Sequence, residues 1–412
     1  YEISCSLVGS EMCIRDRPLT EVLASMEHYG VGIDVGGVRK FGDSLVDEIG
    51  GLESQIYFMC GKEFNISSPK QLGEILHEMG VPLKKKTKTG YSTGAEILEE
   101  LRDSYPVIDL ILRYRQLTKL NSTYVEGLLK TVAQDGRIHT SFRQTETRTG
   151  RISSTEPNLQ NIPVRTELGR EMRKFFVAQD GRTLLDADYS QIELRLVAHI
   201  CADEAMISGF ADGADIHTST AARVFGLPEE MITPEMRSAA KAVNFGIIYG
   251  IGAFSLSKDI NVSVYEAKKY INDYLHKFPN VEKFMNETVE KAKKDGYVTT
   301  MFGRKRYVPE LSASNKNMQA AGKRIAMNTP IQGSAADIIK IAMVRVYGRL
   351  KKEIPEARLI LQVHDELIVE CSENDADRAA EILSEEMTHA CELKVPLIAD
   401  VNRGGSWYDA KG

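Results

Sequence analysis

Residues 358–370 read Arg-Leu-Ile-Leu-Gln-Val-His-Asp-Glu-Leu-Ile-Val-Glu. Two apolar, β-prone runs at residues 359–363 and 367–369 flank the polar triplet His-Asp-Glu, and this pattern predicts a β-hairpin. The turn lacks the Asn-Gly or Asp-Gly pair that commonly closes a hairpin, and it carries an imidazole and two carboxylates instead. It is therefore either a solvated turn or part of a functional site, and a second carboxylate on a similar scaffold would decide between the two.

That second carboxylate follows another predicted strand. Residues 183–185 begin the strand, the segment Asp186-Ala187-Asp188-Tyr189-Ser190 ends it, and a helix begins near Ile192. An acidic residue at the end of a strand, directly before a helix, is well placed at an open edge of a sheet. We therefore expect Asp188 and Asp365 to belong to one site.

Composition sets broad limits on the class of protein. The chain has 412 residues, 42% of them hydrophobic, which is enough for a large core and more than one lobe. The net charge of −6 does not indicate a nucleic-acid partner, but five local clusters of Lys and Arg favour phosphate contacts. The six cysteines show no metal-ligand spacing, which indicates reduced thiols in the cytoplasm. No apolar stretch is long enough to span a membrane.

The first third of the chain is predicted to be mainly helical. Residues 1–17 lack helical or strand periodicity, and we expect them to be a non-native leader, with a short linker as the alternative. Start signals at residues 68–71 and 93–96 predict two helices on either side of a basic loop at residues 84–88. Residues 105–130 are expected to form one long helix. Such a lobe with a basic tip suits contact with a phosphate backbone.

Another helix presents a stripe of unusual chemistry. Thr233-Pro234 is a typical helix start, and after it Arg237, Lys241, Phe245 and Tyr249 recur every four residues. At about 100° per residue, these side chains share a stripe roughly 120° wide. The stripe is either an amphipathic surface or a clamp in which cations bind phosphates and an aromatic ring stacks on a base.

Two further segments are informative. Residues 137–165 interleave hydroxyl, amide and guanidinium groups with little apolar material, as contacts to sugar, phosphate and base edges require. Residues 328–334, which contain Pro330 and Gly333, are expected to interrupt a helix that runs over residues 316–327 and resumes at residues 335–351.

Taken together, these segments resemble the sequence motifs of family A DNA polymerases. Residues 188–195 resemble motif A, the stripe that begins at Arg237 resembles motif B, and residues 363–366 resemble motif C. Residues 149–163 and 330–337 match further family segments. The resemblance runs from about residue 18 to the C-terminus and is greatest to bacterial members of the family.

The resemblance implies an α+β right-hand fold with an antiparallel-sheet palm, helical fingers and a helical thumb. The implied boundaries are residues 18–30 for the start of the palm, 31–134 for the thumb, 135–190 for the palm with the motif A strand, 191–334 for the fingers, and 335–412 for the palm with the motif C hairpin.

The resemblance also implies the chemistry: template-directed addition of deoxyribonucleotides to a primer 3′-hydroxyl with two Mg²⁺ ions, for which Mn²⁺ can substitute. Asp188 and Asp365 would bind both metals, and Lys241 would act as a proton donor. Glu366 is a secondary acidic residue, expected from strand alternation to point elsewhere. The implied nucleotide-binding residues are Gln191, Glu193, His217, Arg237, Lys241, Phe245 and Tyr249. The implied DNA-binding residues are Arg151, Asn158, Gln160, Arg324, Asn328, Gln332 and His364.

The implied partners are primer-template DNA and deoxyribonucleoside triphosphates, bound by a monomer in the bacterial cytoplasm that takes part in replication and repair; a phage-encoded origin stays open. Because the matched region begins at the implied thumb, we expect no nuclease activity from this fragment. Two alternatives stay open. A single-subunit RNA polymerase is disfavoured by Glu193, which would crowd a ribose 2′-hydroxyl. A catalytically silent primer-template-binding protein is disfavoured by the intact Asp188, Asp365, Arg237 and Lys241.

Overall fold

The chain forms helices around antiparallel sheets, which confirms the predicted α+β class. The computed structural model describes residues 16–83, 86–87, 90–163, 167–211 and 215–411. In these residues every strand pairing between named strands is antiparallel. Residues 1–15 of the predicted leader (residues 1–17) lie outside the described residues, and its last residue, Arg17, begins helix α1 (Arg17–Tyr29).

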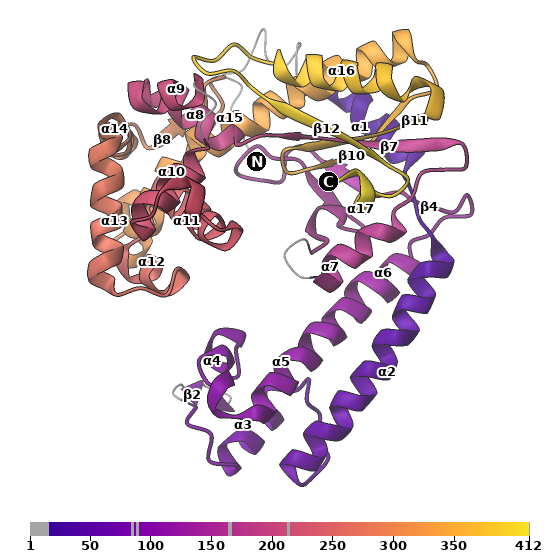
Figure 1. The fold of residues 1–412 in the computed structure, drawn as a ribbon, viewed down its shortest axis with the longest axis vertical. Helices are drawn as coiled ribbons and strands as arrows, with labels where there is room; N and C mark the ends of the chain where they lie inside the picture. The colour runs from indigo at the N-terminus through magenta and orange to yellow at the C-terminus, as the bar shows by residue number, and fades with distance from the viewer. Residues whose placement is uncertain (1–15, 84–85, 88–89, 164–166, 212–214, 412) are drawn as a thin grey trace.

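A four-stranded sheet forms the centre of the molecule (Figure 1). Its spatial order is β10 (Arg358–Val363), β11 (Glu366–Ser372), β7 (Arg182–Tyr189) and β12 (Ala399–Gly404). Most residues of β7 and β11 are buried, including the polar residues Asp186 and Glu370. Helix α16 (Ala376–Thr388) lies on one side of this sheet, and the short helix α17 (Trp407–Ala410) lies on the other.

The predicted hairpin is present, with β10 and β11 joined by a two-residue turn. Val363 pairs with Glu366, so His364 and Asp365 form the turn. His364 has a φ of 53°, in the left-handed region that few residues other than glycine adopt. The side-chain amide of Gln362 donates to the His364 carbonyl (2.7 Å), which holds the turn in this conformation.

A long helical arm extends from the sheet (Figure 1). It pairs α2 (Val35–Cys60) with α5 (Pro106–Lys119), which continues as a π-helical turn (Leu120–Val125) and as α6 (Glu126–Leu129). The predicted helix over residues 105–130 is thus confirmed, with one widened turn. Near the tip of the arm lie α3 (Pro69–Glu78) and α4 (Ala95–Glu99).

The two helix starts near the tip differ in outcome. Ser68 accepts from the Gln71 amide and caps α3, as predicted, although the Gln71 side chain bonds to the Asn65 amide. The predicted capping box at residues 93–96 is wrong, because Gly94 is the N-cap of α4 and has no side chain to offer. The Thr93 hydroxyl and carbonyl accept instead from Arg115 on α5. Of the basic loop, residues 84–85 and 88 lie outside the described residues.

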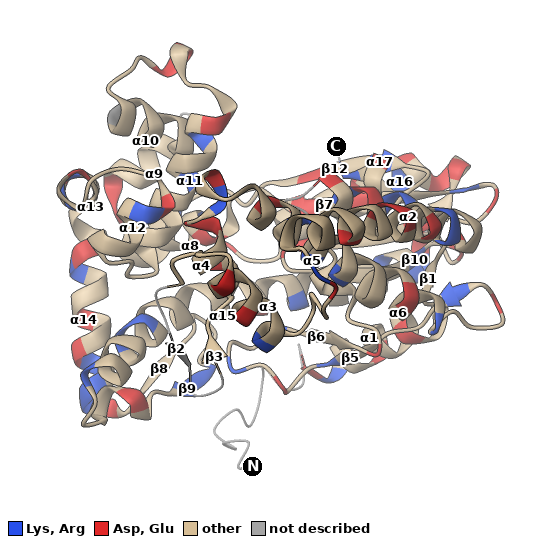
Figure 2. Ribbon diagram, turned by 90° about the horizontal axis from the view of Figure 1, so that it is seen from below, with Lys and Arg blue, Asp and Glu red and all other residues tan. Residues whose placement is uncertain are grey.

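A second helical lobe lies beside the arm on the same side of the sheet (Figure 1). Its helix α11 (Pro234–Ile248) begins where predicted, with the Thr233 hydroxyl accepting from the Met236 amide. A hairpin of β8 (Tyr297–Thr299) and β9 (Lys305–Tyr307) packs beside the basic last turn of α14 (Pro279–Asp295) (Figure 2). The other helices of this lobe are α8 (Ile192–Cys201), α9 (Glu204–Ala211), α10 (Ile216–Phe225), α12 (Ala253–Asp259) and α13 (Val264–Lys277).

The predicted helix break at residues 328–334 is wrong. Helix α15 (Lys316–Glu353) runs unbroken for 38 residues through Pro330. A proline inside a helix removes one backbone donor and crowds the preceding turn. Here the Thr329 hydroxyl donates to the Ile325 carbonyl (2.7 Å) and the Ser334 hydroxyl to the Pro330 carbonyl (2.5 Å), so side chains occupy carbonyl groups on either side of the proline.

The remaining elements are short. They are α7 (Glu167–Glu171) and three two-stranded pairings: β1 (Val31–Gly32) with β4 (Arg137–Ile138), β2 (Lys86–Thr87) with β3 (Gly90–Tyr91), and β5 (Ser141–Arg143) with β6 (Ser153–Thr155). Among the described helices none is both long and apolar enough to cross a membrane.

Candidate active site

The two predicted carboxylates lie at the same end of the central sheet. Asp188 is the penultimate residue of β7, and Asp365 is in the adjacent β10–β11 turn. The Tyr189 amide donates to the Asp365 carbonyl (3.2 Å), so the turn is fastened to the end of β7. Both residues owe their placement to strand registers that their apolar neighbours specify.

Glu366 points away from the cavity that Asp365 lines, in agreement with the expectation from strand alternation. The expectation did not include its contact with the charged cluster around Asp188. Glu366 pairs directly with Asp188 in the β7–β11 register, and both carboxylates contact the ammonium group of Lys411.

Two members of the cluster were not predicted. Lys411 lies directly after α17, and its Nζ is 2.9 Å from Asp188 Oδ2 and 3.9 Å from Asp186 Oδ2. Asp186 is 1% exposed, neither of its carboxylate oxygens has a hydrogen bond, and burial together with the Glu366 charge raises its pKa to about 8. Strand alternation places Asp186 on the same face as Asp188, so the sequence held a signal for it. No local pattern indicates Lys411.

The carboxylates fit a divalent cation. Asp188 Oδ1 is buried without a hydrogen-bond partner, so it has a free lone pair for a ligand. Burial and the neighbouring Asp188 charge raise the pKa of Asp365 to about 7, which means that a cation between the two would be strongly favoured. In the part of the chain that the structure describes, no group of three or more His, Cys, Asp or Glu side chains forms a metal cage. Mg²⁺ commonly uses one or two carboxylates plus substrate phosphates.

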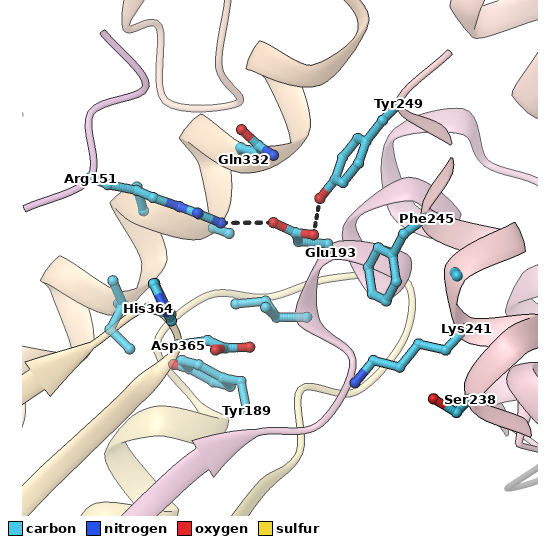
Figure 3. Close-up of a pocket in the computed structure, with 15 residues that line it drawn as sticks. Arg151, Tyr189, Glu193, Ser238, Lys241, Phe245, Tyr249, Gln332, His364 and Asp365 are labelled. Carbon is cyan, nitrogen blue, oxygen red and sulfur yellow. Dashed lines mark hydrogen bonds and ion pairs between the residues drawn. The ribbon is translucent and has the colours of Figure 1, made fainter. Parts of the chain in front are cut away.

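A cavity of about 930 Å³ opens beside Asp365 (Figure 3). It is bounded by the end of the sheet on one side and by α11 on another, and the side chains of Lys241 and Phe245 point into it. Eight of the predicted site residues line it: Arg151, Glu193, Lys241, Phe245, Tyr249, Gln332, His364 and Asp365. Asp188 does not line this cavity; it contacts Lys411.

Glu193 is held between two donors across the cavity (Figure 3). Arg151 Nη2 is 2.9 Å from Glu193 Oε1, and the Tyr249 hydroxyl donates to Glu193 Oε2. Burial and the Glu193 charge raise the pKa of Tyr249 above its usual range, so the phenol stays protonated and keeps donating. The Glu193 carboxylate therefore links three elements: α8, the end of α11 and the loop before β6.

Arg237, the first residue of the α11 stripe, already has an ion-pair partner. Arg237 does not line the cavity; it forms an ion pair with Asp215, the N-cap of α10, and its side chain remains 44% exposed. Lys241, Phe245 and Tyr249 line the cavity together, so the stripe is confirmed as one face with Arg237 at its outer end. Asp215 was not predicted, although an Asp directly before the first residue of a helix, here Ile216 of α10, is typical of an N-cap.

His217 lies buried behind Phe245. Its Nδ1 is 2.9 Å from the Asn244 side-chain nitrogen, while Nε2 is buried without a partner. Burial lowers the pKa of His217 to about 4, so the ring is neutral at pH 7. The imidazole and the Phe245 ring are 5.7 Å apart between centroids, which fixes the tilt of the phenyl group.

The other predicted DNA-binding residues lie around a second cavity or beneath the hairpin. Arg324, Asn328 and Gln332 line a cavity of about 580 Å³ along α15, and Tyr249 and Gln332 border both cavities. Gln160 donates to the backbone and side chain of Gln362. Asn158 accepts from the Gln160 amide, so both side chains already have local structural contacts. Gln191, at the start of α8, has a buried side-chain oxygen without a partner.

Comparison with known proteins identifies the family. A profile described as "DNA polymerase family A" matches residues 37–409. The chain belongs to DNA polymerase family A. Relatives described as "DNA polymerase I" include that of Caldicellulosiruptor bescii, 50% identical over 398 residues and covering 96% of this chain and 47% of the relative. The thermostable DNA polymerase I of Thermus aquaticus is 46% identical over 400 residues, covering 96% and 48%.

A solved structure has the same fold as this family A chain. The polymerase domain of Pol1 from M. smegmatis, in complex with DNA primer-template and dNTP, matches with a TM-score of 0.92 and 43% identity. The match covers 97% of this chain and 71% of that one. The chain spans about half the length of the curated relatives it matches. The resemblance that the motifs indicated is therefore confirmed.

Proposed function

We propose that the chain is a template-directed DNA polymerase that adds deoxyribonucleotides to a primer 3′-hydroxyl. One observation carries the proposal: Asp365 and the cation and aromatic ring of α11, Lys241 and Phe245, line one cavity at the sheet end that carries Asp188. Carboxylates for metals, a cation for phosphates and a flat ring for a base are the groups that nucleotidyl transfer requires. The M. smegmatis domain of the same family holds primer-template and dNTP.

The proposal assigns the three parts of a right hand. Residues 18–30, 135–190 and 335–412 are the palm, residues 31–134 are the thumb, and residues 191–334 are the fingers. The central sheet is the palm, and the arm that pairs α2 with α5 is the thumb. Since α15 is continuous through residue 334, the boundary between fingers and palm lies within one helix.

Asp188 and Asp365 are the proposed ligands of two Mg²⁺ ions, with Mn²⁺ as a substitute. When bound, the two ions activate the 3′-hydroxyl and neutralise the charge that develops on the α-phosphate and the pyrophosphate. The protein holds the two carboxylates at a fixed separation, because one is in a strand and the other in a turn fastened to that strand. Glu366 shares Lys411 with Asp188 and supports its orientation.

The incoming nucleotide is proposed to lie along α11. Lys241 and Arg237 bind the triphosphate, and Lys241 also donates a proton to pyrophosphate. His217, with its unpartnered Nε2–H, donates to a phosphate oxygen. Phe245 stacks on the base and Tyr249 borders the template side. Glu193 crowds a 2′-hydroxyl, and Gln191 contributes its unpartnered side-chain oxygen, an acceptor, to the nucleotide site.

Primer-template DNA is proposed to occupy the space between arm and lobe. Arg151, Gln332 and His364 read minor-groove acceptors at the primer end, which all base pairs share, so they report shape rather than sequence. Arg324 and Asn328 contact the strands along α15, and Asn158 and Gln160 support the hairpin from below. The proposed setting is a monomer in the bacterial cytoplasm that acts in replication and repair.

Primer extension tests the proposal. A labelled primer-template, four deoxyribonucleotides and Mg²⁺ should give extension by the wild type, and Asp188→Asn should lower the rate by about 10³-fold or more, because several kcal/mol of charge stabilisation is lost. Equal rates for wild type and variant would reject the enzyme reading. Equal use of ribonucleotides would favour an RNA polymerase. The same 412 residues should release no nucleotides from a single-stranded 3′ end.

A further inference from the structure

Four charged residues form a cluster at the end of β7: Asp186, Asp188, Glu366 and Lys411. Of these, the proposed chemistry uses only Asp188 as a metal ligand. Three carboxylates, those of Asp186, Asp188 and Glu366, surround one ammonium group, Lys411 Nζ. Glu366 is 4% exposed and Asp186 is 1% exposed, so both are shielded from water. Buried carboxylates of like charge repel one another unless a cation offsets the repulsion.

Close packing of α17 against the central sheet places Lys411 in this cluster. The Trp407 amide donates to the Phe176 carbonyl (2.8 Å), and the Trp407 ring packs at 87° against that of Phe176. At Gly404 of β12, an added Cβ would lie 2.5 Å from the Ala410 amide nitrogen. Only glycine therefore allows α17 to approach the sheet closely enough for the next residue to reach Asp188.

The second nearby cation, Arg173, contacts Glu366 and the Trp407 ring. Arg173 lies 3.8 Å from Glu366 through Nη1, but its guanidinium stacks on the Trp407 ring at 3.9 Å from the centroid. Its Nε and Nη1 have no hydrogen-bond partner. Lys411 is the group that contacts both Asp188 and Glu366 directly.

We propose that Lys411 is a positioning residue for Asp188 and that its charge, balanced against Asp186, sets the affinity of the site for divalent cations. The ammonium group holds Oδ2 of Asp188, which leaves Oδ1 as the free lone-pair donor. The inference rests on the proposed function in one respect, that Asp188 is a metal ligand. When ionised, Asp186 has the opposite effect, because its carboxylate then adds negative charge two residues along the same face.

Cation affinity and turnover rate should respond differently to substitutions at Lys411 and Asp186. Affinity for a cation depends on the sum of the nearby charges, so it should rise when Lys411 is neutralised and fall when Asp186 is neutralised. The turnover rate depends on how Asp188 is held, so it should follow Lys411 alone. A merely structural lysine would not produce this separation.

The first experiment uses Mn²⁺ as the probe, without DNA or nucleotide. Both experiments use pH 8.5, at which the Asp186 carboxyl, with its pKa of about 8, is mostly ionised. The thermal unfolding midpoint of the full chain is measured in EDTA and over a Mn²⁺ titration. Lys411→Met should lower the midpoint in EDTA and tighten the apparent Mn²⁺ dissociation constant by about tenfold. Asp186→Asn should raise the midpoint in EDTA and weaken Mn²⁺ binding by a similar factor. Lys352→Met, which removes an exposed lysine of α15, is the matched control and should change neither.

The second experiment combines the variants in primer extension over a range of Mg²⁺ concentrations. Asp186→Asn/Lys411→Met should return to near wild-type Mg²⁺ dependence but keep the reduced kcat of Lys411→Met, and Lys411→Arg should recover most of that kcat. The proposal is overturned if Lys411→Met matches Lys352→Met, or if the double variant restores kcat as well. If Lys411→Met does not fold, unchanged Mn²⁺ affinity in Asp186→Asn overturns it. A wild type that extends no primer rejects the proposed function, and the Mn²⁺ titration still tests the inference.

Discussion

Glu366 faces Asp188 directly across the β7–β11 ladder, and the carboxylates of both contact Lys411. Asp365, one residue earlier, is in the turn and lines the cavity. The structure thus divides the acidic residues into a pair, Asp188 and Glu366, that shares the Lys411 cation, and Asp365, which faces the cavity. This division leads to a ranking of their variants.

Alanine at Asp365 or Asp188 should abolish most activity, with kcat lower by about 10³-fold or more, because each removes a proposed metal ligand. Glu366→Gln should cost about tenfold, since the amide keeps the shape and loses only the ion pair with Lys411. His364→Ala should raise the KM for primer-template more than it lowers kcat. Steady-state kinetics with matched unfolding midpoints measures all four. A loss for Glu366→Gln as large as that for Asp365→Ala would make Glu366 a ligand.

The Glu193 network predicts a change in sugar selectivity. Glu193→Ala should reduce the preference for deoxyribonucleotides over ribonucleotides by about 10- to 100-fold, or roughly 1–3 kcal/mol, because the group that crowds the 2′-hydroxyl is gone. Tyr249→Phe is the control: it removes only the hydroxyl that donates to Glu193, and Arg151 still holds the carboxylate. The ratio of kcat/KM for the two substrates is the measurement. An unchanged ratio in Glu193→Ala would assign selectivity elsewhere.

His217 predicts sensitivity to acid. Its Nδ1 faces the Asn244 amide donor, and the Asn244 oxygen accepts from Thr220, so a proton on Nδ1 would meet another donor. Burial lowers the pKa of His217 from 6.5 to about 4. Because the folded protein binds fewer protons than the unfolded chain between these values, stability falls as the pH falls through that window.

The expected loss from His217 between pH 7 and pH 5 is about 2 kcal/mol. His217→Gln, which has no titrating group, should lose correspondingly less over the same interval. Denaturant unfolding at the two pH values gives the difference. If wild type and variant respond equally to the pH change, the ring is protonated without penalty and the packing argument fails.

A buried ion pair behind the β8–β9 hairpin predicts a large stability effect. Asp337 is 0% exposed on α15; Arg304 donates to it through Nε and Nη2, and Thr300 donates to its other oxygen. Arg304→Met should destabilise the protein by about 3–5 kcal/mol, because a buried carboxylate loses the guanidinium group of Arg304. Adding Asp337→Asn should recover most of that loss.

A surface arginine offers the control for this prediction. Arg102 pairs with Asp109 and Glu99, and all three side chains are about half exposed. Arg102→Met should therefore cost no more than about 1 kcal/mol. Thermal or denaturant unfolding compares the single and double variants. Similar losses for Arg102→Met and Arg304→Met would contradict the buried-pair argument.

Local patterns predicted much of the scaffold. The strand at residues 182–189, the 358–370 hairpin and the start of α11 at Thr233 follow from apolar runs and capping signals that act over a few residues. The same signals misled where tertiary contacts override them. Pro330 does not end its helix because the residues around it, including Ile331 and Ser334, are buried in the packing of α15, and Gly94 replaces Thr93 as the cap because Arg115 engages Thr93.

Only the site residues that belong to recognisable sequence motifs could be predicted. Resemblance supplied the residues that line the cavity, from Arg151 to Asp365, and the structure brings them together. Lys411 could not be predicted, because it lies 223 residues from Asp188 in the chain and reaches it through the packing of α17. The sequence holds a local signal for each of two unpredicted residues: Asp215 precedes a helix, and Asp186 lies two residues before Asp188 on the same face of a strand. Nothing in the sequence alone identifies the charged partners of either residue.

Helix α15 has a mechanical consequence for any closing motion around the cavity. At 1.5 Å per residue its 38 residues extend roughly 57 Å, and the one rod carries Arg324, Asn328 and Gln332 before it packs against the sheet. Those side chains therefore keep fixed positions relative to one another along α15. Lys241, Phe245 and Tyr249 are carried by α11 and its C-cap, so the distance between the two sets depends on how α11 and α15 pack. We expect crosslinks within α15 to be tolerated and a crosslink between α11 and α15 to lower turnover.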